Sequence, residues 1–293
     1  MKFGLWYASV GPFAFPDAAS QLAKAAEDAG IESLWTGEHV AVPAGYQSEY
    51  PYSESGRMAG DGAVPMAEPM VWHAYIAAKT SRIRLVTGVL VLAQREPVLV
   101  AKQAATLAVL SDERFALGIG GGWLREEFEA LGADFGTRIR RMEEYVAAMR
   151  ALWAEPKATF DGEFVSFKDL QLSPRPASGR VPVIVGGHTE AAARRAGRIG
   201  DGFFPAKGSR EELTRLFEVA RKAAEAAGRD PEAIEFSVHD PSIIDPRVSA
   251  EAIEAWRKIG ASRIIISPTS FDPGQVTEQI GRFGEEVVSH ASS

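Results

Sequence analysis

The feature that most restricts the fold is a repeated alternation of short apolar runs with longer segments of helical periodicity. Strands that alternate with helices are joined by right-handed crossovers, so neighbouring strands pair in parallel. Eight such strand–helix pairs follow one another along the chain. The predicted pairs are, in order, Lys2–Tyr7 with Asp17–Gly30, Ser33–Thr36 with Glu68–Thr80, Arg82–Leu92 with Val98–Ser111, Phe115–Ile119 with Leu124–Leu131, Val181–Val185 with Thr189–Ile199, Gly202–Pro205 with Arg210–Ala227, Ile234–Val238 with Ala250–Ile259, and Arg263–Ile266 with Pro273–Val288.

Eight pairs favour a closed (β/α)8 TIM barrel, an α/β fold, over an open doubly wound sheet. An open Rossmann sheet would carry a G-x-G-x-x-G fingerprint after its first strand, but residues 8–12 contain none. A barrel typically needs about 250 residues, and this chain has 293. We therefore predict one barrel domain over residues 1–293, with an insertion after strand four at residues 132–180. That segment contains an expected helix, Arg138–Trp153, and an apolar alternation at Phe164–Phe167.

Composition removes several classes of function. The chain has no cysteine, which excludes disulfides, thiolate catalysis and cysteine-based metal sites. Its five histidines are scattered, so we predict no metal site. A net charge of -7 argues against a nucleic-acid partner, since phosphate backbones require clustered Lys and Arg. With no leader-like N-terminus and no apolar stretch of about 18 residues, we expect a cytoplasmic protein that does not engage a membrane.

In a (β/α)8 barrel the catalytic groups lie at the carboxyl ends of the strands. The second predicted strand runs into Glu38 and His39, which we take as catalytic candidates. A histidine at this position can donate a hydrogen bond to a cofactor carbonyl or move a proton near neutral pH. The alternative is that these two side chains cap the loop or bond each other.

Glycines follow the third and fourth strands. Gly88 interrupts Thr87–Val89, and a glycine inside a strand indicates a bulge or the close approach of another group. Gly120, Gly121 and Gly122 precede Trp123 and a helix, so their exposed amides could admit an anion or a flat ring. The alternatives are a glycine required by barrel packing and a tight turn beneath Trp123.

The fifth strand ends in Gly186, Gly187, His188 and Thr189 before an alanine-rich helix. His188 or Thr189 lies near the helix N-cap, and amides at that position are suited to a phosphate. A late βα loop often holds phosphate in this fold, although a plain capped turn fits the same residues. The sequence contains no zinc-protease, serine-hydrolase or Walker A motif.

Taken together, several blocks resemble the luciferase-like monooxygenase superfamily, the bacterial luciferase-like flavin and deazaflavin oxidoreductases, and particularly its coenzyme F-420 branch. The blocks are Trp35–His39, Arg82–Val89, Pro97–Gln103, Leu117–Trp123 with Glu127, Gly186–Gly187 and Gly200–Phe203. The resemblance implies a tricyclic cofactor across the barrel mouth, with its phosphate at Gly186–Thr189. It also implies a non-proline cis peptide at or beside Gly88–Val89, and His39 near the reactive face of the ring as part of a Glu/Asp–His pair.

The activity that the resemblance implies is hydride transfer between coenzyme F-420, an 8-hydroxy-5-deazaflavin, and a small organic substrate. One alternative is an FMN-dependent two-component monooxygenase of the alkanal or alkanesulfonate type, served by a separate reductase. Another is a non-catalytic flavin-binding barrel. The family is commonly dimeric, so a homodimer is expected.

Two features bear on the substrate. Gly121 stands where some deazaflavin sugar-phosphate dehydrogenases of this superfamily have a carboxylate, which argues against that specific activity. Tyr46, Tyr50 and Tyr52 indicate either an apolar substrate side or a lid that faces solvent.

Overall fold

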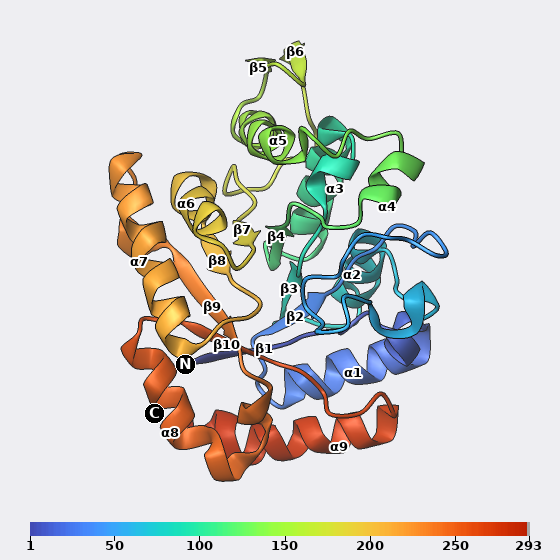
Figure 1. Ribbon diagram of the computed structural model, residues 1–293, viewed down its shortest axis with the longest axis vertical. Coiled ribbons are helices and arrows are strands. Elements are labelled where there is room, and N and C mark those ends of the chain that lie inside the picture. The colour runs from blue at the N-terminus through green and yellow to red at the C-terminus, as the bar shows by residue number, and fades with distance from the viewer. Residues whose placement is uncertain (292–293) are drawn as a thin grey trace.

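The computed structural model describes residues 1–291, in which eight parallel strands close into a barrel. Their order around the barrel is β1-β10-β9-β8-β7-β4-β3-β2, so the first and last strands pair and leave no open edge. Figure 1 shows the helices arranged around these strands. The prediction of a (β/α)8 barrel is confirmed. The strands are β1 (Lys2–Leu5), β2 (Ser33–Thr36), β3 (Arg84–Thr87), β4 (Phe115–Ile119), β7 (Val183–Gly186), β8 (Gly202–Phe204), β9 (Glu235–His239) and β10 (Arg263–Ile266).

The helices of the outer ring begin at acidic residues followed by proline in four cases. Proline is preorganised for the first helical position, and the preceding carboxylate accepts an otherwise unpaired backbone N–H. The caps are Glu68, Glu96, Asp245 and Asp272, each bonded to an amide two or three residues later. The helices are α1 (Pro16–Asp28), α2 (Pro69–Ala77), α3 (Pro97–Leu110), α4 (Arg125–Ala130), α5 (Arg138–Ala154), α6 (Glu190–Ile199), α7 (Arg210–Ala226), α8 (Pro246–Lys258), α9 (Pro273–Phe283) and α10 (Ser289–Ala291).

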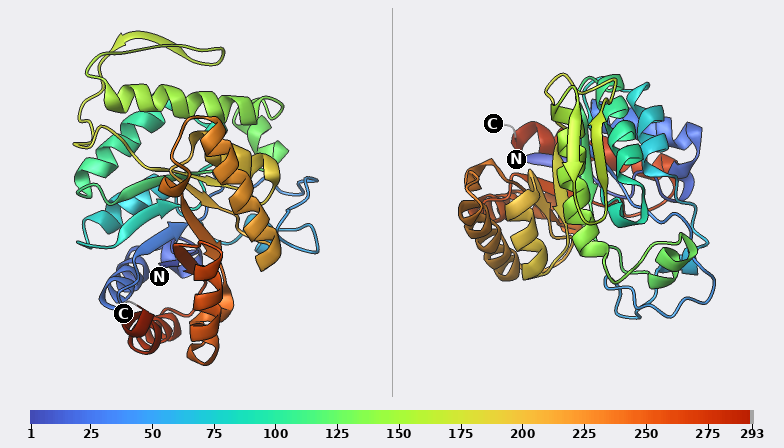
Figure 2. Two further views of the ribbon diagram at one scale, coloured as in Figure 1. Left: turned by 90° about the vertical axis from the view of Figure 1, so that its left-hand side faces the viewer. Right: turned by 90° about the horizontal axis from the view of Figure 1, so that it is seen from above.

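The segment 132–180 contains α5 and a two-stranded antiparallel sheet, β5 (Ala158–Asp161) with β6 (Ser166–Leu170). Helix α5 packs against α3 and α6, which gives it a place in the ring between them. The β5–β6 hairpin projects beyond α5, at the top of the left view in Figure 2. Helix α4 is the short addition between β4 and α5.

Opposite ends of the barrel interior differ in chemistry. The inside is filled by large apolar side chains, among them Trp35 and Phe204. At the amino ends of the strands, Arg263 is fully buried and forms two 2.8 Å hydrogen bonds with the Glu32 carboxylate. Glu235 lies 3.4 Å from the same guanidinium. A buried charge remains stable only when it is paired in this way, so this end is sealed and the carboxyl end is left for function.

Candidate active site

His39 lies directly beyond β2, at the carboxyl end of the barrel. Its Nδ1 is 3.0 Å from Oε2 of Glu127, a residue of α4, and both side chains are largely buried. The edge of the His39 ring contacts Trp123, with ring centres 5.5 Å apart. No other hydrogen bond to the His39 ring is found among the described residues, and Nε2 is not sealed from solvent. His39 therefore presents one free nitrogen at the barrel mouth.

Glu127 holds the loop that carries His39 as well as the ring itself. Its Oε1 accepts the backbone N–H groups of Val40, at 2.6 Å, and Ala41, at 3.1 Å. Its Oε2 accepts Nε2 of Gln94 at 3.1 Å in addition to His39. Burial raises the pKa of the Glu127 carboxyl, but the hydrogen bonds from His39, Gln94 and Ala41 outweigh it and leave the pKa below its usual value. The carboxylate is thus ionised at neutral pH.

Glu38 does not pair with His39, contrary to the Glu/Asp–His pair expected for it. Its carboxylate accepts the Val91 N–H at 2.6 Å and forms an ion pair with Arg95. The side chain is only 1% exposed, so it cannot reach a ligand. Successive residues of an extended segment point to opposite sides, which explains why Glu38 fixes the loop after β3 while His39 faces the mouth. We therefore reassign Glu38 from catalysis to loop anchoring.

The third strand ends in the expected non-proline cis peptide, between Gly88 and Val89. The indole of Trp6 donates to the Gly88 carbonyl at 3.0 Å. Thr87 is buried and donates its hydroxyl to the Gly118 carbonyl at 2.7 Å, so its side chain is not free to bind a cofactor. The bulge consequently offers its backbone and the Val89 side chain, rather than Thr87, to the barrel mouth.

The glycines around this bulge pack closely against other side chains of the protein. A Cβ on Gly120 would lie 2.4 Å from Val89, and one on Gly186 would lie 2.7 Å from it. Gly121 meets Ile139 at 2.7 Å, and Gly122 has a φ of +70°, where residues with side chains are strained. The packing and tight-turn alternatives thus account for these positions without a ligand.

The loop after β7 contains the strongest indication of an anion site. Thr189 is the N-cap of α6 and accepts the Ala192 N–H at 3.2 Å, as predicted. The Gly187 N–H is engaged by the Phe204 carbonyl at 3.2 Å. In the part of the chain described, residues 188–191 donate their amides to no protein acceptor. Nδ1 of His188 is also buried without a partner, so this loop has unused hydrogen-bonding groups.

A row of aromatic rings connects His39 with His188. Trp123 contacts both His39 and Tyr50, Tyr50 contacts Tyr52, and Tyr52 contacts His188, with successive ring centres 5.1–5.5 Å apart. Tyr50 and Tyr52 at the middle of the row belong to residues 46–62, which lie beside α4 (Figure 1). Lys207 bonds the Pro51 carbonyl from the other side. This segment therefore covers the mouth between its two predicted functional ends.

Three functional candidates at the ends of β1 and β9 were missed from the sequence. His239, at the end of β9, hydrogen-bonds Ser267, just beyond β10, through Nε2 at 2.9 Å. Trp6 contacts His239 edge-on and stacks on Tyr7. Burial lowers the pKa of His239 and raises that of Tyr7, so both are neutral near pH 7. Their positions just after strands were the available signal.

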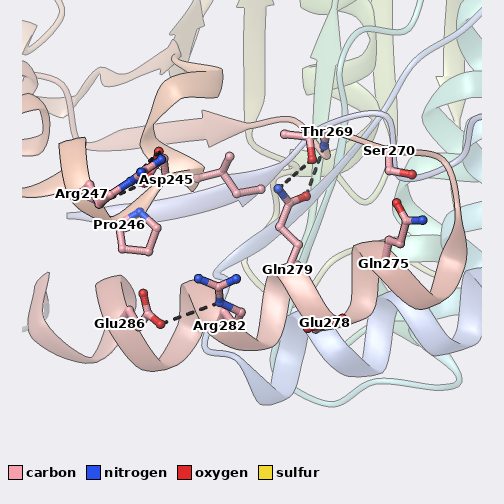
Figure 3. A pocket seen from close by; sticks show the side chains of 11 residues that line it. Asp245, Pro246, Arg247, Thr269, Ser270, Gln275, Glu278, Gln279, Arg282 and Glu286 are labelled. Atoms are coloured by element: carbon pink, nitrogen blue, oxygen red, sulfur yellow. Dashed lines mark hydrogen bonds and ion pairs between the residues drawn. The ribbon is translucent and has the colours of Figure 1, made fainter.

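A cavity of about 640 Å³ lies elsewhere, between the start of α8 and α9 (Figure 3). Its charged and polar groups are largely paired with one another, through Asp245 with Arg247, Thr269 with Gln279, and Arg282 with Glu286. It contains none of the predicted site residues. The barrel mouth therefore remains the candidate active site.

Two further findings concern residues 1–291. No group of three or more His, Asp or Glu side chains is placed to hold a metal ion there. Nor does that part of the chain contain a helix long and apolar enough to cross a membrane.

The protein is thus a closed (β/α)8 barrel with a histidine–carboxylate pair and the N-capped start of α6 at its carboxyl end. Residues 6–283 match the luciferase-like monooxygenase family. The chain belongs to this family, and it is an enzyme of the oxidoreductase type.

Relatives of known and unknown activity are similar to the chain. An uncharacterized protein of Mycobacterium tuberculosis is 38% identical over 208 residues, which cover 71% of this chain and 72% of that protein. An F420-dependent glucose-6-phosphate dehydrogenase of Kineococcus radiotolerans is 34% identical over 235 residues, covering 78% of this chain and 64% of the relative. The second of these relatives supports the coenzyme F-420 branch of the family.

Solved structures share the fold at lower identity. An F420-dependent secondary alcohol dehydrogenase has a TM-score of 0.79 at 19% identity, with 98% of both chains covered. A monooxygenase from Streptomyces bottropensis has a TM-score of 0.76 at 24% identity, covering 99% of this chain and 100% of that one. Both kinds of chemistry are thus found on this architecture.

Proposed function

We propose that this protein transfers hydride between coenzyme F-420 and a small organic substrate, with His39 as the proton-transferring residue. The observation that carries the proposal is the His39–Glu127 pair, whose free imidazole nitrogen opens at the barrel mouth. The similarity to an F420-dependent dehydrogenase supports the deazaflavin over FMN. When bound, the cofactor would supply a carbon that accepts or gives hydride.

The residues present fit a phosphate-bearing cofactor of this type. The free amides of residues 188–191 and the unpartnered Nδ1 of His188 are suited to phosphate oxygens. Burial, and then the nearby Lys207 ammonium, lowers the pKa of His188, so its ring is neutral and can donate one hydrogen bond. The backbone of Gly88–Val89 would support the ring system, as the resemblance implies.

His39 would exchange a proton with the substrate oxygen while the surrounding rings limit access of water. Trp123 packs against His39, and Tyr46 packs against Trp123 with ring centres 5.4 Å apart. A general acid or base of this kind contributes roughly 10²- to 10⁴-fold to a rate. Replacing His39 should therefore reduce turnover without abolishing cofactor binding.

We propose a neutral, largely apolar substrate. The mouth is lined on two sides by Trp6, Tyr7 and the tyrosines of residues 46–62. The ammonium of Lys207 contacts the Pro51 carbonyl and the Tyr52 ring. A sugar phosphate would need clustered cations here, so we expect the substrate to differ from that of the glucose-6-phosphate dehydrogenase relatives.

The test is a titration of the purified protein with coenzyme F-420 and with FMN, followed by fluorescence and thermal shift. A ligand that binds only the folded state raises the melting temperature by mass action. Tight binding of F-420 alone, with turnover that falls roughly 100-fold or more in His39→Gln, is the expected result. Tight binding of FMN alone would overturn the proposal in favour of a monooxygenase served by a separate reductase. Binding without turnover on any donor would indicate a non-catalytic barrel.

A further inference from the structure

The hydrogen-bonding environment of His39 determines which of its nitrogens carries hydrogen. We infer that Glu127 is a positioning residue that holds neutral His39 as the Nδ1–H tautomer, so that Nε2 presents its lone pair to the barrel mouth. The importance of this tautomer for catalysis rests on the proposed function. The tautomer itself does not depend on it.

The Glu127 carboxylate is saturated with hydrogen-bond donors. A carboxylate has about four acceptor positions. Oε1 takes the N–H groups of Val40 and Ala41, and Oε2 takes Nε2 of Gln94 together with Nδ1 of His39. No position is left for a proton on the carboxylate, in agreement with its lowered pKa. Because an ionised carboxylate can only accept, Nδ1 of His39 must be the donor.

Glu127 also fixes the orientation of the ring relative to its own backbone. The amides that it binds belong to the two residues immediately after His39, so one carboxylate holds both the imidazole and the loop that carries it. Trp123 contacts the ring from the side. A rotation that brought Nδ1 to the mouth would break the bond to Glu127 and leave a buried anion short of a donor, which is costly.

This tautomer suits a specific proton transfer. In the oxidative direction the substrate O–H bond breaks, and its proton passes to the lone pair on Nε2 of His39. A deazaflavin bound as proposed would supply the hydride acceptor: the carbinol carbon would lose its hydrogen with the electron pair to it as the C–O single bond becomes a carbonyl. The imidazolium then donates from Nδ1 to the Glu127 carboxylate, whose negative charge stabilises it, as in a serine-protease triad. Glu127 itself exchanges no proton.

The direct test is the side-chain ¹⁵N spectrum of the ligand-free protein, which distinguishes protonated from unprotonated imidazole nitrogens. The His39 signals are assigned by their loss in His39→Gln. We expect protonated Nδ1 and unprotonated Nε2 in the neutral ring of the wild type. A wild-type spectrum with hydrogen on Nε2 would overturn the inference, whether or not any variant folds.

Glu127→Gln and Glu126→Gln form a matched pair on adjacent residues of α4. Among residues 1–291, the Glu126 side chain bonds Gln47 and Ser48, and no hydrogen bond joins it to His39. We expect Glu127→Gln to lose the tautomer preference and to lower kcat roughly 100-fold or more with little change in KM. Glu126→Gln should keep the wild-type His39 spectrum. An unchanged spectrum in a folded Glu127→Gln would contradict the positioning role.

The catalytic role of His39 and its positioning by Glu127 can be contradicted independently of each other. If the tautomer is as inferred but neither His39→Gln nor Glu127→Gln alters turnover, the catalytic role of His39 is wrong and the positioning by Glu127 stands. If the tautomer is reversed, the inference fails even when His39→Gln is inactive.

Discussion

At the scale of single residues, the bulge after β3 depends on a glycine that sequence motifs do not single out. A Cβ on Gly118 would lie 1.8 Å from the carbonyl oxygen of Thr87, a backbone atom that no rotamer change can move. The carbonyl of Gly118 also accepts the hydroxyl of Thr87 and the N–H of Leu90. Gly118 thus allows β4 to approach the bulge closely enough to hold it.

Gly118→Ala should therefore destabilise the protein by about 3 kcal/mol, because the clash can be relieved only by separating two paired strands. Urea unfolding measures the change. Gly281→Ala in α9 is the control, since nothing lies within 4 Å of its added Cβ. Alanine there should raise the free energy of unfolding by up to about 1 kcal/mol through helix propensity. Equal effects of the two substitutions would contradict the packing argument.

At the scale of elements, the short helix α4 acts as a clamp for the loop after β2. Glu127 binds residues 39–41, and Glu126 accepts the N–H of Gln47 at 2.7 Å and the hydroxyl of Ser48 at 2.6 Å. The hydrogen bond from the Ser48 hydroxyl, followed by that from the Gln47 amide, lowers the pKa of Glu126 to about 2. Two neighbouring carboxylates thus fix the start of the segment that covers the mouth.

Glu126→Ala should release this start of the segment without unfolding the barrel. We expect faster hydrogen exchange at Gln47 and Ser48, measured by NMR, and only a small decrease in the melting temperature at neutral pH. The folded-state pKa of Glu126 is depressed from 4.5 to about 2. The contribution of the carboxylate is therefore present above pH 4.5 and disappears as the pH falls through about 2, where wild type and variant should converge. A large loss of global stability would show that α4 does more than clamp this loop.

The sequence predicted the bounds of strands better than the contacts between distant residues. The bounds of β2, β4 and β10 coincide with the expected ones, because each is an apolar run between clear turn or helix signals. His39 was found by its position after a strand. Its partner Glu127 is 88 residues away, and the loops after β2 and β4 come together because both strands pair with β3. Local pattern carries no information on such a contact.

Two other residues show where local pattern misleads. Glu38 beside His39 suggested a pair, yet alternation along extended backbone sends the two side chains apart. Gly120 suggested an open amide, yet Val89 fills the space above it. In both cases the outcome depends on a neighbour from another strand.

At the scale of the whole molecule, α2 and α3 differ from the rest of the helical ring. Their outward residues include apolar side chains that lie open to solvent: Val71 is 69% exposed and Leu99 is 57% exposed. The two helices pack side by side. Apolar surface on the outer side of adjacent helices indicates a contact with another protein surface, and we propose that the homodimer expected from the family forms here.

Val71→Glu combined with Leu99→Glu should weaken such a dimer by at least about 100-fold, since like charges would meet across a two-fold axis. Analytical ultracentrifugation at micromolar concentration measures the change. Leu131→Glu, at the end of α4, is the control and should leave the association intact. A wild type that sediments only as a monomer would rule out this dimer.

On the proposed function, we expect the row of rings from His39 to His188 to determine the order in which ligands enter. A tricyclic cofactor with its phosphate at residues 188–191 and its ring system beside Gly88–Val89 would have to displace these rings before it could reach either place. Once it is seated, a smaller molecule can occupy only the space that remains between it and residues 46–62. We therefore expect ordered addition, with the large ligand first in and last out, and no competition by a high concentration of the small ligand for the empty enzyme.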